Sequence, residues 1–383
     1  MREVAVLGIG QTPVSEHWEK SLRELAGDAA LAALEDAGQE RADALYVGNM
    51  MSGSANHQQH LGSYIADWIG LRGIEALRLE SACSSGAAAF RAGYIAVASG
   101  EVEIALVVGV EKMSDSSGSE ISSALAPAAD ADWEVDQGVS FVALNAMLMR
   151  RYMYEYGWKR EDFMPFSLNA HANAVHNPNA RLGKAISEKA YLQAPMVAEP
   201  VSIMDASPMG DGAAAIVLGS RRCLAANRKA VIVAGSAAAT DSLAVHDRRD
   251  GTWLQAAELS AQRAYELAAV GPQDVDLFEL HDAFTIMAAL SLEAAGFAER
   301  GQGPRLALEG EITLKGRIPV ATRGGLKARG HPVGATGMYQ LVEVVEQLRG
   351  EAGATQVDGA RVGMAQNIGG SGSNIVTHIL QVG

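Results

Sequence analysis

Cysteine is rare in this sequence, and one of its two cysteines lies where a nucleophile would lie. Cys83 follows the strand-like run EALRLES (75–81) and precedes a helix-like run that begins with small residues. A thiol at the N-terminus of a helix is near the positive end of the helix dipole, which favours the thiolate. Position alone leaves a nucleophile and a structural cysteine in a tight turn about equally favoured. Cys223 lacks these features, and we interpret it as structural.

A nucleophilic cysteine needs a base or an electropositive partner, most often histidine, and two of the nine histidines are suitably placed. His281 ends the run VDLFEL, and His331 lies in the glycine-rich segment RGHPVGATG. Ligands of α/β sheets bind beyond the carboxyl ends of strands, where Cys83, His281 and the loop NIGGSGSN (367–374) can converge. The glycines of this loop would leave N–H groups open to an oxyanion, and a plain turn is the alternative. We expect the other histidines at the surface or in satisfied hydrogen bonds: His17, His57, His60, His171, His176, His246 and His378.

Strand-like and helix-like runs alternate at both ends of the chain, which is typical of α/β proteins whose helices cover a parallel or mixed sheet. We predict N-terminal strands at 4–10, 44–50, 75–81 and 104–113, and a helix at 21–38 that begins at Ser21 and ends at Gly38. We predict C-terminal strands at 230–240, 275–282, 361–370 and 373–380, and helices at 259–271, 283–296 and 334–350. The helix at 259–271 is expected to stop at Gly271.

The two ends of the chain resemble each other, which indicates an internal duplication. At one constant offset Gly38 aligns with Gly271 and Asp43 with Asp276. We predict one half at 1–113 plus 206–225, another at 226–383, and an inserted subdomain at 114–205. Such an insertion is usually a lid or a substrate-binding subdomain, with packing or a subunit contact as the alternative.

Composition narrows the class of protein. The chain has 383 residues, 48% of them hydrophobic, and a formal net charge of −14, which disfavours nucleic acid and anionic membranes as partners. Apolar runs are too short to span a bilayer, and the N-terminus enters a strand at once, so we expect a cytoplasmic protein. No spacing suggests a metal site or a dinucleotide fingerprint. The basic stretch RGGLKARGH (323–331) could still bind an anionic small ligand.

Five segments, in this order, resemble the thiolase family of acyl-CoA C-acyltransferases over essentially the whole chain. They are SACSSG (81–86), SPMGDGAAAIVL (207–218), HDAF (281–284), GGLKARGHPVGATG (324–337) and NIGGSGSN (367–374). The match is closest to the archaeal-type and sterol-carrier-type branches. It implies a duplicated thiolase fold, in which two βαβαβαββ halves form a five-layer αβαβα sandwich with an inserted loop subdomain.

The resemblance implies a role for four residues. Cys83 attacks the thioester and carries the acyl group, and His331 takes the thiol proton and donates a hydrogen bond to a thioester oxygen. His281 orders a water or itself stabilises the enolate oxygen of the second substrate. The N–H groups of Cys83 and Gly369 form the oxyanion hole. A Claisen step develops charge on two different oxygens, so it needs two sets of donors.

The sequence departs from the family where a second cysteine is expected. Most thiolases carry it at the position of Asn367, and the sterol-carrier branch at the position of Ala283. Asparagine cannot exchange a proton at neutral pH, so His281 is the first candidate for the second acid/base. Arg323 replaces a residue of the loop beside His331, and it either contacts a CoA phosphate or is exposed. We assign Asn367, Arg323 and Lys327 to substrate binding.

The implied reaction condenses two acetyl-CoA to acetoacetyl-CoA and CoA, or cleaves 3-ketoacyl-CoA in reverse. CoA and acetyl-CoA are substrates, and no permanently bound cofactor is expected. The family forms homodimers and tetramers, and archaeal relatives are thought to work with a hydroxymethylglutaryl-CoA synthase and a small zinc/OB-fold bridging protein. The missing second cysteine favours an alternative, a low-activity protein that binds acyl-CoA or lipid or acts as a scaffold. A decarboxylating ketoacyl synthase or hydroxymethylglutaryl-CoA synthase is disfavoured, because those enzymes lack the GHPVGATG and HDAF pair.

Overall fold

A computed structural model describes residues 2–225 and 228–383. Within these residues the main sheet has nine strands in the order β3-β2-β4-β7-β1-β8-β11-β10-β9. Its N-terminal strands are β1 (Val4–Gln11), β2 (Ala44–Gly48), β3 (Glu75–Leu79), β4 (Ile104–Glu111) and β7 (Gly212–Ser220). Its C-terminal strands are β8 (Val231–Thr240), β9 (Leu277–Glu279), β10 (Val362–Gly369) and β11 (Asn374–Val382).

The strand order shows the predicted duplication. It runs β3-β2-β4-β7-β1 in the first half and, in mirror order, β8-β11-β10-β9 in the second. Within the sheet, the ladder that joins the two halves, β1 with β8, consists of one pair of residues, Ala5 and Ile232. The second half has one strand fewer than the first. In place of β3 it has only an isolated bridge between Phe278 and Val320.

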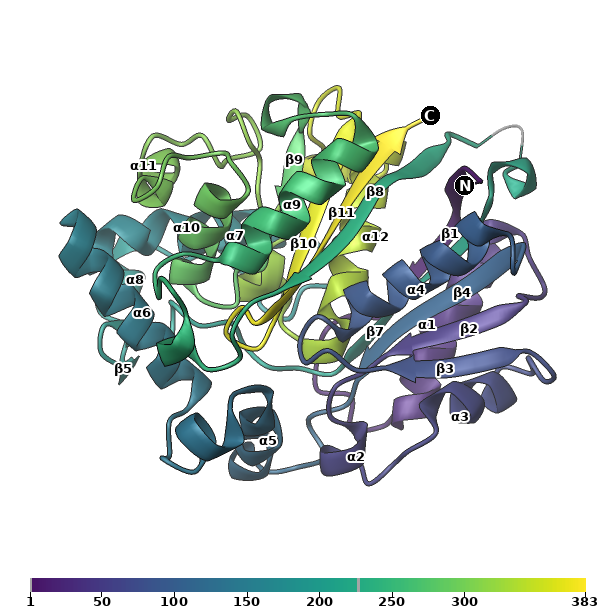
Figure 1. The fold of residues 1–383 in the computed structure, drawn as a ribbon, viewed down its shortest axis with the longest axis horizontal. Coiled ribbons are helices and arrows are strands. Elements are labelled where there is room, and N and C mark those ends of the chain that lie inside the picture. Colours follow the sequence, from purple (N-terminus) through teal and green to yellow (C-terminus); the bar gives the residue numbers. More distant parts are fainter. Residues whose placement is uncertain (1, 226–227) are drawn as a thin grey trace.

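Helices divide the molecule into five layers (Figure 1). Helices α1 (Leu22–Ala37) and α3 (Leu61–Trp68) cover the outer face of the first half, and α9 (Gln255–Ala268) and α10 (Thr285–Ala294) cover that of the second. Between the halves lie α4 (Ser85–Ser99) and α12 (Thr336–Arg349), which contact each other, and α12 packs against strands of both halves. The five-layer thiolase-like sandwich expected from the sequence is therefore confirmed.

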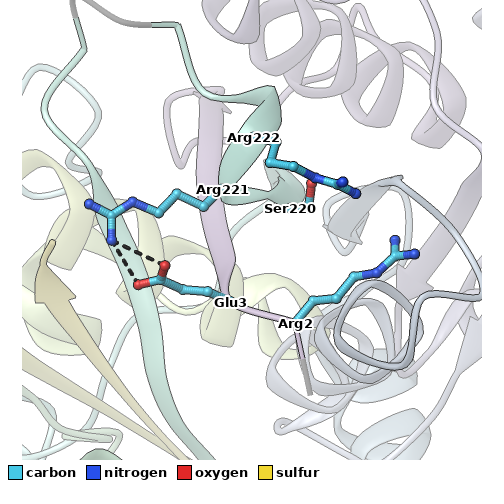
Figure 2. Close-up of a pocket in the computed structure, with 5 residues that line it drawn as sticks. All are labelled: Arg2, Glu3, Ser220, Arg221 and Arg222. Atoms are coloured by element: carbon cyan, nitrogen blue, oxygen red, sulfur yellow. Dashed lines mark hydrogen bonds and ion pairs between the residues drawn. The ribbon is translucent and has the colours of Figure 1, made fainter.

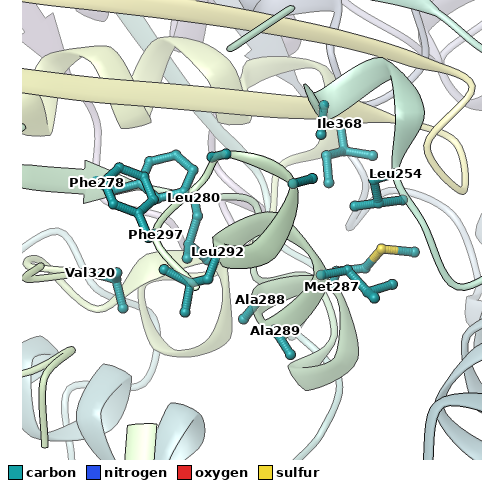
Figure 3. Close-up of a cluster of buried hydrophobic side chains, with 14 of the residues drawn as sticks. Leu254, Phe278, Leu280, Met287, Ala288, Ala289, Leu292, Phe297, Val320 and Ile368 are labelled. Carbon is teal, nitrogen blue, oxygen red and sulfur yellow. The ribbon is translucent and has the colours of Figure 1, made fainter. Parts of the chain in front are cut away.

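Buried apolar side chains hold these layers together. Figure 3 shows part of the cluster around α10, in which Leu292 lies near Leu280 on one side and Met287 lies near Leu254 on the other. Burying each such side chain contributes about 1.5–3 kcal/mol. This core fixes β9, and with it the chain segment that leads to His281.

The segment between β4 and β7 contributes no strand to the main sheet. It holds α5 (Gly118–Leu125), α6 (Phe141–Tyr156), α7 (Met164–Ala174), α8 (Glu188–Leu192) and a hairpin of β5 (Met196–Ala198) and β6 (Val201–Ser202). Two short helices complete the fold, α2 (Ser52–Ala55) and α11 (Gly303–Leu308). The domain boundaries and the role of 114–205 as a lid stay predictions. None of the helices in residues 2–225 and 228–383 is long and apolar enough to cross a bilayer.

Most predicted elements are present, and the caps of α1 are as expected. Glu24 accepts a hydrogen bond from the Ser21 N–H at 2.8 Å, and Gly38 ends the helix at φ 64°. The predicted stop of α9 at Gly271 is wrong, because Ala269 takes the left-handed conformation at φ 53°. Gly271 is extended and begins the next turn instead.

Candidate active site

Cys83 lies in a sharp turn between β3 and α4. Ala82 has φ 48°, a left-handed conformation that costs roughly 1–2 kcal/mol for a residue with a Cβ. The Ser84 N–H donates to the Ser81 carbonyl at 3.0 Å, and the Ser85 hydroxyl accepts from the Ser81 N–H at 2.9 Å. Local hydrogen bonds thus stabilise a strained turn that places the thiol at the start of α4, as predicted.

The surroundings of Cys83 disfavour its thiolate. Burial, followed by the charge of Glu111, raises the pKa of Cys83 to about 12, although the N–H groups of Cys83 and Gly370 act in the opposite direction. The expectation that the helix N-terminus would favour the thiolate is therefore outweighed by loss of solvent. Cys83 needs a base that removes its proton as it attacks.

His331 is the candidate for such a base that the resemblance implies. Its Nδ1 lies 2.7 Å from the Thr336 hydroxyl, which itself donates to the Pro332 carbonyl at 3.4 Å. The hydroxyl can accept from Nδ1–H while it donates to this carbonyl, and this arrangement leaves Nε2 unprotonated. Burial, followed by the charge of Arg329, lowers the pKa of His331 to about 3. The imidazole is neutral at physiological pH, with its Nε2 lone pair free.

His281 has the opposite tautomer. Nδ2 of Asn367 lies 2.9 Å from His281 Nδ1, and because an amide nitrogen can only donate, Nδ1 accepts and the ring proton is on Nε2. Burial first, then the neighbouring His331 and Arg329, lowers the pKa of His281 well below its usual range. His281 is thus a neutral hydrogen-bond donor, which suits an oxyanion better than it suits proton removal.

The two imidazoles face each other. Their ring centroids are 5.2 Å apart with an interplanar angle of 86°, so one ring presents its edge to the other. His331 lies on the loop before α12 and His281 follows β9. The structure thus places the two candidate histidines side by side, and their catalytic roles stay predictions.

Glycines bring the Cys83 turn against the other two segments. A Cβ on Gly369 would lie 2.6 Å from the Ser81 carbonyl oxygen, so the loop after β10 touches the cysteine turn. A Cβ on Gly86 would lie 2.8 Å from the Gly334 carbonyl oxygen, so the start of α4 touches the loop of His331. A Cβ on Gly337 would lie 2.5 Å from Asn367 Oδ1. These close approaches join Cys83, His331 and Asn367 in one site.

The glycine loop also brings an N–H group to the thiol. The N–H of Gly370, which has φ 58°, acts to lower the pKa of Cys83, whereas the sequence assigned an oxyanion-hole N–H to its neighbour Gly369. Gly369 instead provides the close approach to the Ser81 carbonyl. Its role in an oxyanion hole stays a prediction.

Two of the predicted substrate contacts are buried cations. Arg323 is not exposed, which excludes one of its predicted alternatives: its Nε lies 3.1 Å from Glu346 Oε2, and its Nη1 donates to the Ala352 carbonyl. This ion pair occupies the guanidinium and does not favour a contact with a CoA phosphate. Burial lowers the pKa of Lys327 to about 8, and Asp205 and Asp282 oppose that shift. Substrate binding by Asn367, Arg323 and Lys327 stays a prediction.

The sequence analysis missed a buried carboxylate beside the site. Glu111 ends β4 and accepts hydrogen bonds from the N–H groups of Met50, Met51 and Gly334, at 3.0, 3.0 and 2.9 Å. Burial raises its pKa to about 7. It ties the His331 loop to the sheet, and the signal was a lone acid at the end of the apolar run IALVVGVE.

A surface hollow of about 550 Å³ lies at the other end of the sheet (Figure 2). Arg2, Glu3, Ser220, Arg221 and Arg222 line it, near the start of β1 and the end of β7. Arg221 pairs with Glu3 there at 3.0 Å. Cys83 and His281 follow the carboxyl ends of β3 and β9, away from these strand ends, so this hollow is separate from the site. Residues 2–225 and 228–383 contain no group of three or more His, Cys, Asp or Glu side chains that could hold a metal ion.

Comparisons with known proteins cover the whole chain. The family model "Thiolase, N-terminal domain" matches residues 4–222, and "Thiolase C-terminal domain-like" matches residues 237–382. The acetyl-CoA acetyltransferase of Methanothermobacter thermautotrophicus is 46% identical over 99% of each chain. That of Methanocaldococcus jannaschii is 38% identical, again over 99% of each chain. The solved Ltp2-ChsH2(DUF35) aldolase has the same fold, with a TM-score of 0.87 and 23% identity over 99% of this chain and 98% of that one.

Proposed function

This chain belongs to the thiolase family, and we propose that it transfers acetyl groups between CoA thioesters through Cys83. The reaction is the condensation of two acetyl-CoA to acetoacetyl-CoA and CoA, or the reverse thiolysis. The observation that carries this proposal is the pair of neutral histidines, His281 and His331, whose rings lie edge to face beside the partly buried Cys83. The full-length similarity to two acetyl-CoA acetyltransferases supports the choice of acyl group.

In the first half-reaction His331 Nε2 takes the Cys83 proton as Sγ attacks the thioester carbon. The N–H groups of Cys83 and of the Gly369–Gly370 segment stabilise the oxygen of the tetrahedral intermediate. The carbon–sulfur bond to CoA then breaks, and the proton on His331 goes to the leaving thiolate. The products are acetyl-Cys83 and free CoA, and His331 is neutral again.

In the second half-reaction an acetyl-CoA loses an α-proton and its carbon attacks acetyl-Cys83. His281 donates from Nε2–H to the enolate oxygen, because Asn367 holds its proton on that nitrogen. His331 Nε2 is then the free base of the site and takes the α-proton. As the new carbon–carbon bond forms, the bond between the acyl carbon and Cys83 Sγ breaks, acetoacetyl-CoA leaves, and the Cys83 thiolate takes the proton back from His331. This assignment revises the expectation that His281 is the second acid/base, and it lets the site work without a second cysteine.

The experiment is thiolysis of acetoacetyl-CoA by purified protein in the presence of CoA. We expect the enolate absorbance of acetoacetyl-CoA to fall, and expect this fall to vanish in Cys83→Ala. The Cys223→Ala variant is the control, because that cysteine lies in the turn after β7, and its activity should match the wild type. No fall under any condition would support the alternative of a CoA-binding or scaffold protein.

We also propose partners for the condensation direction. Condensation of two acetyl-CoA is uphill, so an enzyme that consumes acetoacetyl-CoA, such as a hydroxymethylglutaryl-CoA synthase, would draw it forward through a small zinc/OB-fold bridging protein. The solved aldolase of the same fold carries a DUF35 component in its name. Co-purification of the three proteins tests this proposal. We also expect this protein to form a homodimer or tetramer, which its oligomeric state in solution tests.

A further inference from the structure

The parallel ladder between β9 and β10 ends just before the site. Its last pair is Glu279 with Ala365. Beyond this pair the two chains separate, one toward His281 and the other toward Asn367. The carbonyls at this fork are buried and have lost their ladder partners, so they need other donors.

Gln340, on the second turn of α12, supplies those donors. Its Nε2 donates to the carbonyl oxygens of Glu279, Leu280 and Gln366 at 3.1, 2.9 and 3.1 Å. The side chain is 1% exposed. The two N–H groups of this amide thus donate to three carbonyls. They replace the hydrogen bonds that the ladder between β9 and β10 would have formed beyond its last pair.

The same helix also orients the other histidine. Thr336 and Gln340 are four residues apart and so lie on one face of α12. Thr336 holds His331 Nδ1 at 2.7 Å, while Gln340 holds the residues directly before His281 and Asn367. The distance between the two histidines therefore depends on one rigid helical turn.

We propose that Gln340 is a positioning residue that sets the placement of His281 relative to His331 in the reaction. This inference rests on the proposed function. Gln340 does not touch the reacting atoms; it acts through the backbone of Leu280 and Gln366. A purely structural role, by contrast, would affect stability without a specific effect on the step that His281 serves.

A second glutamine of α12 is a matched control. Gln347 is also 1% exposed, and it also bonds backbone groups, donating to the Thr355 carbonyl and accepting from the Val357 N–H, each at 2.8 Å. It lies two turns further from the site. The variants Gln340→Met and Gln347→Met remove similar hydrogen bonds with little change in volume.

The test is the kinetics of acetoacetyl-CoA thiolysis in both variants, together with their melting temperatures. A misplacement of about 1 Å can cost about 100-fold in rate, so we expect kcat to fall about 10- to 100-fold in Gln340→Met, with KM within about twofold. We expect Gln347→Met to keep its kcat within about twofold at a similar loss of melting temperature. In a His281→Ala background the added effect of Gln340→Met should be less than about twofold, because the histidine it positions is gone.

Three results would overturn the proposal: an unchanged kcat in Gln340→Met, an equal loss of kcat in Gln347→Met, or an undiminished effect in the His281→Ala background. If Gln340→Met does not fold, Gln340→Glu keeps the length of the side chain and serves in its place, with the same expectations. A crystal structure of the variant separates this proposal from the proposed function. It should show the 2.9 Å contact between His281 and Asn367 broken, whatever reaction the enzyme performs.

Discussion

Asn367 donates its side-chain N–H to Nδ1 of His281 across 2.9 Å, and this bond decides which nitrogen of the histidine carries the proton. An asparagine at the place of a family cysteine is therefore a residue with a different task. It moves no proton, and in the proposed mechanism it holds His281 as a donor toward the substrate. The asparagine that stands in place of the thiol and the histidine of the HDAF segment are therefore directly linked, through this hydrogen bond.

Asn367→Asp should reverse the tautomer. A carboxylate can only accept, so it would take Nδ1–H and leave Nε2 of His281 without the proton that the enolate oxygen needs. Losing one such donor costs about 10²–10³-fold in kcat, and we expect a loss of this size in thiolysis. Acetylation of Cys83 by acetyl-CoA, followed by mass spectrometry of the intact protein, should remain within about threefold.

The control for this variant is Asn173→Asp, a buried asparagine that donates to the Ala321 carbonyl at 3.0 Å. Its thiolysis rate should stay close to that of the wild type. Equal kinetic losses in the two variants would mean that a buried charge, and not the tautomer, is responsible.

Cys83 should react slowly with iodoacetamide at neutral pH. Its pKa is about 12 because burial and the Glu111 charge disfavour the thiolate, so its alkylation rate should rise about tenfold per pH unit from 7 to 10 without a plateau. The fast adduct that a helix N-terminus predicts is not expected. Peptide mass spectrometry separates Cys83 from Cys223.

Glu111→Gln tests whether the charge of Glu111 raises the pKa of Cys83. Removing the negative charge should lower the pKa of Cys83 and raise its alkylation rate at pH 8. Glu120→Gln is the control, because Glu120 is an exposed acid whose carboxylate caps α5. A plateau near pH 8 in the wild type would contradict the high pKa.

Several features of the site were predictable because they depend on local sequence. A cysteine between small residues at a helix start, the caps of α1 and two histidines near strand ends can all be found this way. The burial of Arg323 was not predictable, because its partner Glu346 lies two turns into α12, which only the fold brings near. β7 was missed since its first half is a run of alanines, and residues that favour strands follow only at 216–218. The length of β9 was overestimated because no turn residue ends this strand. It ends where its chain separates from that of β10.

The protein should lose stability as the pH rises from about 6.5 to 8. Burial, followed by the charge of Glu343, raises the pKa of Glu279 to about 8. A carboxyl whose folded pKa is raised contributes stability that is fully present below its unfolded pKa of about 4.5 and lost as pH rises through the folded pKa. Below pH 6.5 the lowered pKa values of His281 and His331 act in the opposite direction, because the unfolded chain then binds more protons there. The loss of stability that Glu279 causes is therefore measurable only above pH 6.5.

Urea unfolding at several pH values measures this effect. Glu279→Gln should reduce the loss between pH 6.5 and 8 by at most about 1.4 kcal/mol per pH unit, which is the slope of one proton. Its Oε1 accepts from the Thr322 N–H at 2.8 Å, a bond that glutamine can keep. Glu309→Gln, at an exposed position, should leave the slope unchanged. A slope identical in wild type and Glu279→Gln would assign the effect to other groups.

Gly369→Ala should lower activity through a steric clash alone, since it removes no charge and no hydrogen-bonding side chain. The added Cβ would lie 2.6 Å from the Ser81 carbonyl oxygen and 2.8 Å from the Ser84 hydroxyl, closer than real Cβ contacts come. The loop after β10 must then move away from the cysteine turn and take the Gly370 N–H with it. We expect kcat for thiolysis to fall about 100-fold, the cost of a displacement of about 1 Å, and Cys83 acetylation to fall with it. Gly118→Ala, where a Cβ meets nothing within 4 Å, is the control and should be indistinguishable from wild type. Wild-type acetylation in Gly369→Ala would mean that the loop does not need this approach, and that the N–H groups near the thiol play no part in the first half-reaction.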